Sequence, residues 1–102
     1  MLRGARQVFR LKVAYVQAED VEEEQIFLNI VDELAVTAGI PIPVAIVIEK
    51  ERAVNAFALG DVETQTVIGV TEGMLATLSR DELQGVVAHE MAHLIHGDSV
   101  IC

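Results

Sequence analysis

Two histidines four residues apart, His89 and His93, constrain the fold of this 102-residue chain more than any other feature. Residues with this spacing lie one above the other on the same face of an α-helix, so both imidazoles can reach one metal ion. Glu90 comes directly after His89, so it would flank the ion and act as a general base toward a metal-activated water. The HExxH pattern therefore predicts a helical zinc site, with His89 and His93 as ligands and Glu90 as the catalytic base.

The residues before the pattern predict that it lies inside a helix. Ser79, followed three residues later by Glu82, is typical of a capping box at a helix start. Leu83, Val86, Val87 and Leu94 then supply apolar positions at helical spacing. Gly97 is expected to end the helix. The alternative is a chance match in which the histidines are ordinary surface or core residues, and the helical context argues against it.

Composition and charge narrow the function classes. The net charge of −9 argues against a nucleic-acid partner. The single cysteine, Cys102, cannot form an intrachain disulfide, and no stretch approaches the roughly 20 apolar residues of a membrane span. Four of the seven basic residues fall in the first twelve positions. We interpret residues 1–18 as a basic arm, either a solvated tail or a segment beside a membrane, and 19–102 as the folded part.

Periodicity and turn signals predict an α+β domain with a small sheet. Asp20 is expected to cap a helix that ends at Gly39, and Thr71 to cap a short helix over 72–78. Residues 44–48 are β-branched and predict a buried strand, and residues 49–52 predict a polar turn. Alternation over 8–16 indicates either a strand or an arm without a fixed partner. The expected hairpin joins strands over 53–59 and 66–70.

A catalytic zinc site needs three protein ligands, and the pattern supplies two. His96 would lie roughly 4.5 Å further along the helix axis than His93, so its ring would overshoot the ion. Asp98 is a candidate for a carboxylate that orients a ligand imidazole, the alternative being an ordinary residue after the helix. We expect the third ligand to lie beyond residue 102.

Three segments together resemble a known family. They are residues 54–60, residues 70–75, and residues 81–88 running through the HExxH pattern to Gly97 and Asp98. In that order they resemble the HtpX-like membrane zinc endopeptidases, relatives of the CaaX prenyl proteases within the gluzincins. The resemblance implies a zincin-like half-domain, one Zn²⁺ per site, and a third ligand that is a glutamate on a later helix. It also implies that Asn55, Ala56 and Phe57 lie beside the cleft that binds a polypeptide substrate. Leu59 stands where the family usually has threonine.

The resemblance also implies a cellular setting. Members carry transmembrane helices beside this domain, so we expect an excised soluble part of a protein of the inner membrane whose catalytic domain faces the cytoplasm. Its reaction would be hydrolysis of peptide bonds in membrane or misfolded proteins, as in stress-related quality control. Two other classes remain open: a membrane-associated sensor or regulatory module on the same scaffold, and a metal-free α+β interaction domain. With a ligand missing, the chain alone is expected to bind zinc weakly and to be inactive.

Overall fold

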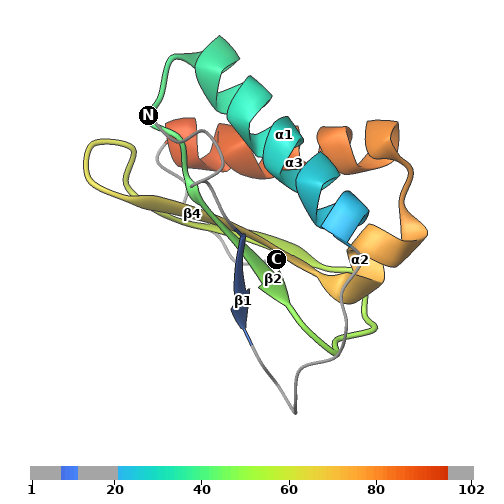
Figure 1. Cartoon of the computed structure of the whole chain (residues 1–102). Coiled ribbons are helices and arrows are strands. Elements are labelled where there is room, and N and C mark those ends of the chain that lie inside the picture. Colours follow the sequence, from blue (N-terminus) through green and yellow to red (C-terminus); the bar gives the residue numbers. More distant parts are fainter. Residues whose placement is uncertain (1–7, 12–20, 97–102) are drawn as a thin grey trace.

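The structure is a computed structural model that describes residues 8–11 and 21–96 (Figure 1). It confirms the α+β class that the sequence predicts. In chain order the elements are strand β1 (Val8–Leu11), helix α1 (Val21–Ala38), strands β2 (Val44–Ile48), β3 (Ala56–Gly60) and β4 (Thr66–Thr71), and helices α2 (Glu72–Thr77) and α3 (Arg80–Ile95).

The four strands form one sheet in the order β1-β2-β4-β3. Strand β2 runs parallel to both β1 and β4, whereas β3 and β4 form the expected antiparallel hairpin. Helices α1 and α3 lie on the same side of the sheet (Figure 1). Helix α3 packs against α1 and β3, so the HExxH helix lies over the edge of the sheet that β3 forms.

The core lies between this face of the sheet and the two long helices. Alternate residues of the central strands are buried there, because successive side chains of a strand point to opposite faces. The strands contribute Ala45, Val47, Ala56, Ala58, Ile68 and Val70, and the helices contribute Phe27, Ile30, Val31, Leu83, Val87, Met91 and Leu94. The buried residues of α3 fix its rotation about its own axis, and this determines which of its residues face outward.

The hydroxyl of Thr71 holds the start of β3 and the start of α2 together. It accepts hydrogen bonds from the backbone N–H groups of Asn55 (3.2 Å) and Met74 (3.1 Å), and it donates one to the carbonyl of Ala53. Thr71 therefore caps α2, as the sequence predicts. Because Ala53 and Asn55 bond to this hydroxyl, strand β3 begins at Ala56, three residues later than predicted.

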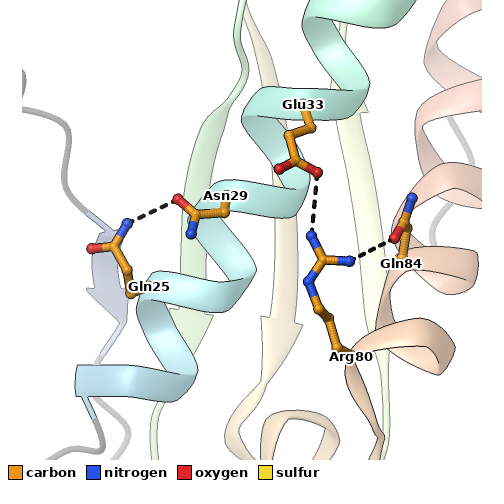
Figure 2. A network of polar contacts seen from close by, with 5 residues as sticks. All are labelled: Gln25, Asn29, Glu33, Arg80 and Gln84. Atoms are coloured by element: carbon orange, nitrogen blue, oxygen red, sulfur yellow. Dashed lines mark hydrogen bonds and ion pairs between the residues drawn. The ribbon is translucent and has the colours of Figure 1, made fainter.

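A polar network joins α1 to the first turn of α3 (Figure 2). Arg80 donates hydrogen bonds to Gln84 (2.9 Å) and to Glu33 of α1 (3.2 Å). The side chains of Arg80 and Glu33 are 44% and 62% exposed, so solvent screens their ion pair and its contribution to stability is small. A second pair, Gln25 and Asn29, bonds along the outer side of α1 (3.0 Å).

Several further sequence predictions can be compared with the structure. Gly39 has a φ of 74° and ends α1 as expected, since glycine adopts this left-handed conformation without strain. Residues 8–11 form a strand, the first of the two alternatives for that segment. Glu49 lies in the turn that the sequence predicts, but its side chain is buried, with only 2% exposed. Asp20 and Gly97 lie outside the described residues. Within the described ranges, no helix is long and apolar enough to cross a membrane.

Candidate metal centre and active site

The helix that carries HExxH begins as the sequence predicts. The Ser79 hydroxyl accepts a hydrogen bond from the backbone N–H of Glu82 (3.2 Å), and the Glu82 carboxylate accepts one from the backbone N–H of Ser79 (2.9 Å). This reciprocal pair is a complete capping box, which satisfies two backbone donors that a helix start otherwise leaves free. Helix α3 continues to Ile95, with His96 at its C-cap, so all of HExxH lies in regular helix.

The two imidazoles of the pattern converge. The Nε2 atoms of His89 and His93 lie 3.2 Å apart, and the rings meet edge to face with centroids 4.7 Å apart. Tetrahedral zinc with Zn–N bonds of roughly 2.0–2.1 Å would hold two nitrogen ligands about 3.3–3.4 Å apart. His89 is exposed and His93 is half-buried, so solvent can reach the pair. The helix thus brings two imidazole nitrogens to a common point.

Glu90 follows His89 in α3 and is only 4% exposed. Its Oε1 atom has no hydrogen-bond partner among the residues that the structure describes. A buried carboxylate oxygen without a partner is costly, because it has lost its hydration and received nothing in return. Its position beside two converging imidazoles fits a group that accepts a proton from water activated at a metal. The donor set and the orphaned oxygen therefore both fit a zinc site.

The described residues do not complete such a site. Over residues 8–11 and 21–96, no group of three or more His, Cys, Asp or Glu side chains could hold a metal ion. His96 is exposed at the end of α3 and belongs to no such group. Asp98 lies outside the described residues. The described residues thus bring together two candidate ligands, His89 and His93.

Strand β3, which follows Asn55, presents its outer edge beside α3. The carbonyl of Asn55 accepts a hydrogen bond from the backbone N–H of Thr71 (3.0 Å), so these two opposed residues form a hydrogen-bonded pair. In antiparallel pairing the bonding direction alternates, and the backbone groups of Ala56 and Ala58 therefore point away from β4. The N–H of Ala56 already bonds to the side-chain oxygen of Asn55 (3.0 Å). The Ala56 carbonyl and both backbone groups of Ala58 point toward this edge, but Ala56 is only 5% exposed and Ala58 is fully buried, so the edge is covered at these residues.

The Phe57 side chain lies on the face of β3 opposite to Ala56 and Ala58. Its ring fills the space that a side chain at Gly69 of β4 would occupy. It is half-buried and lies directly opposite Gly69. A Cβ atom added to Gly69 would come within 2.1 Å of the Phe57 ring. The ring therefore packs on the bare backbone of Gly69, which anchors the edge strand. In the described structure, Asn55 forms hydrogen bonds with Thr71 and Ala56, and none with α3.

A surface cavity of about 480 Å³ lies beside α2, and neither histidine lines it. Its lining residues are Lys50, Glu51, Arg52, Glu72, Gly73, Ala76 and Thr77.

The sequence predicted only a capping role for Thr71. The structure adds that its hydroxyl fixes Asn55, which no local pattern in the sequence could have indicated because the two residues are sixteen positions apart.

Converging imidazoles beside a buried glutamate on one helix are the arrangement that HExxH metallopeptidases use. The chain belongs to peptidase family M48, whose sequence pattern matches residues 22–102. It is 42% identical to a Protease HtpX homolog of Pyrococcus furiosus over 91 residues, which are 87% of this chain and 31% of the relative. It is also 42% identical to Protease HtpX of Legionella pneumophila, over 82% of this chain and 30% of the relative. A Protease HtpX homolog of Thermodesulfovibrio yellowstonii is 39% identical over 90% of this chain and 33% of its own length.

These relatives confirm the HtpX-like resemblance. The chain spans about a third of the length of the curated relatives that it matches.

Proposed function

We propose that this chain is the N-terminal part of the catalytic domain of a zinc-dependent metalloendopeptidase with a zincin-like fold. His89 and His93 are the zinc ligands, Glu90 is the general base, and the third ligand comes from beyond residue 102. The observation that carries the proposal is the 3.2 Å convergence of two imidazoles beside a buried carboxylate oxygen that has no partner in the described structure. Family membership supports the same reading.

Each functional group of the site would have a separate role in hydrolysis. Zinc, when bound, would supply the Lewis acid that polarises the scissile carbonyl and acidifies water. Glu90 would accept the proton of the attacking water and later donate it to the leaving amine. Its burial keeps competing water away from the carboxylate, so that the proton passes between groups that are already in place. Asp98 would orient a ligand imidazole through its second ring nitrogen.

We further propose that the substrate is an extended polypeptide that binds beside the start of β3, where Asn55 is exposed. Asn55, Ala56 and Phe57 would lie along the bound peptide. The side-chain N–H₂ of Asn55 has no bond in the described structure and would donate to a substrate carbonyl. Phe57 would hold the strand in place through its packing on Gly69.

The setting that we propose follows from the family resemblance. The protein would be embedded in the inner membrane, with the catalytic domain on the cytoplasmic side, and would cleave membrane or misfolded proteins. Residues 1–18, which carry four of the seven basic residues, would lie next to the membrane, where anionic lipids attract lysine and arginine.

A glutamine substitution tests the proposed chemistry. In the protein extended to the length of its relatives, Glu90→Gln should reduce cleavage of an unfolded protein substrate by at least about a hundredfold. Zinc content should stay unchanged, because Glu90 is not a ligand. Glu33→Gln, the same change on the exposed side of α1, is the matched control and should leave cleavage unchanged. Full cleavage by Glu90→Gln would exclude the proposed base, and a protein that holds zinc without cleaving any peptide would favour the sensor class.

A further inference from the structure

The loop between β2 and β3, residues 49–55, is bonded to the junction of β4 and α2. Near its beginning, the backbone N–H of Lys50 donates a hydrogen bond to the Glu72 carboxylate (2.9 Å). The backbone N–H of Gly73 donates one to the Glu51 carbonyl (2.8 Å). The contact is close, because a Cβ atom added to Gly73 would come within 2.1 Å of a carbonyl oxygen of the loop. The loop therefore lies directly on the first turn of α2.

Thr71 holds the other end of this loop, where it joins β3. Its hydroxyl accepts a hydrogen bond from the backbone N–H of Asn55 (3.2 Å) and donates one to the Ala53 carbonyl. Its own backbone N–H donates to the Asn55 carbonyl (3.0 Å). Both backbone groups of Asn55 are thus bonded to one residue that is only 3% exposed. The backbone of Asn55 is fixed by these bonds although the residue itself is exposed.

The side chain of Asn55 is fixed as well. Its carbonyl oxygen accepts a hydrogen bond from the backbone N–H of Ala56 (3.0 Å), so the amide N–H₂ group is the end that is left for an outside partner. An exposed side chain ordinarily samples several rotamers and loses that freedom when it binds. Here the bonds of Asn55 hold its donor in one direction before a partner arrives. Such preorganisation raises affinity, because less conformational entropy is lost on binding.

We propose that Thr71 is a positioning residue for substrate binding. This role rests on the proposed function, in which the Asn55 amide donates to a carbonyl of the bound peptide. Thr71 itself does not touch the substrate. It fixes the backbone from which the Asn55 side chain projects, and so directs the amide toward the peptide. Its hydroxyl bonds join β3 and α2 and do not involve α3, so its loss should change KM and leave kcat unchanged.

A double-mutant cycle in the protein of the relatives' length tests this role, with casein as the unfolded substrate. Asn55→Ala and Thr71→Val should each raise KM by about three- to tenfold, with kcat and zinc content unchanged. In the Asn55→Ala background, Thr71→Val should add less than about twofold, because Thr71 acts through that side chain. Thr71→Ser keeps the hydroxyl and should keep the original KM. Gly39→Ala strains the end of α1, where φ is 74°, and should lower the melting temperature without raising KM.

A measurement on the unsubstituted chain of 102 residues does not depend on how well Thr71→Val folds. The order parameter of the Asn55 backbone N–H, from nitrogen-15 relaxation, should be about 0.85, the value of rigid backbone, although the residue is exposed. A value below about 0.6 would overturn the proposed role, because Asn55 would then move freely.

Three results of the cycle would also overturn it. The first is an unchanged KM in Thr71→Val. The second is a double mutant whose rise in KM is the product of the two single rises, since Thr71 would then act independently of Asn55. The third is an equal rise in Gly39→Ala, since lost stability alone would then account for the change. An unchanged KM in Asn55→Ala would instead remove the proposed substrate contact itself, and full cleavage by Glu90→Gln would remove the proposed base.

Discussion

Replacing Glu90 by leucine should stabilise the chain while abolishing any chemistry that depends on the carboxylate. Glu90 is only 4% exposed, and its Oε1 atom has no partner in the described structure. Leaving a buried polar atom unsatisfied costs about 1–3 kcal/mol, and leucine of similar volume removes that cost. We therefore expect the free energy of unfolding to rise by about 1–3 kcal/mol, a large change for a domain of this size. The melting temperature should rise by at least about 4 °C.

The assay is urea unfolding followed by far-ultraviolet circular dichroism. The midpoint should move to higher urea with an unchanged slope, which indicates a stability change without a change of denatured state. Glu90→Gln should gain less, because its amide oxygen is still unsatisfied. Glu33→Leu, at an exposed position, should change stability by no more than about 1 kcal/mol. A loss of more than about 1 kcal/mol in Glu90→Leu would refute the reasoning, since Glu90 would then have a stabilising partner.

Three further substitutions test the framework around the site by urea unfolding. Thr71→Val should cost about 2–3 kcal/mol, because it removes three hydrogen bonds, and Thr71→Ser should recover most of the loss; equal losses in both would show that the hydroxyl contributes little. Gly69→Ala should cost about 1–3 kcal/mol through its clash with the Phe57 ring, and adding Phe57→Leu should relieve it; additive effects would count against the contact. Ser79→Ala should cost about 1 kcal/mol by removing the capping box, and a neutral result would mean that α3 does not depend on its cap.

Local signals predicted the elements that hold the candidate metal ligands. The HExxH spacing, the Ser79–Glu82 capping box, the Thr71 cap and the Gly39 stop each depend on backbone chemistry within a few residues. For this reason the helices came out nearly as expected, and the histidines converge as their spacing requires.

Features that depend on distant residues were not predictable. The parallel pairing of β2 with β1 and β4 joins residues far apart in sequence, and no periodicity encodes that register. The late start of β3 results from the Thr71 hydroxyl, sixteen residues from Asn55. The burial of Glu49 depends on tertiary packing, whereas its neighbours in sequence are polar and indicated a turn. The third zinc ligand that we propose could not be predicted from the spacing of two histidines, because that spacing describes one turn of one helix.

The most direct test of the account is zinc-edge X-ray absorption on the zinc-loaded protein of the relatives' length. We expect one zinc per chain with two imidazole nitrogens at about 2.0–2.1 Å and one further protein ligand. His89→Ala and His93→Ala should each lose the metal, while Glu90→Gln keeps it with the same spectrum. A spectrum without imidazole scattering, or zinc retained unchanged after both histidines are replaced, would contradict the assignment of His89 and His93 to a metal centre.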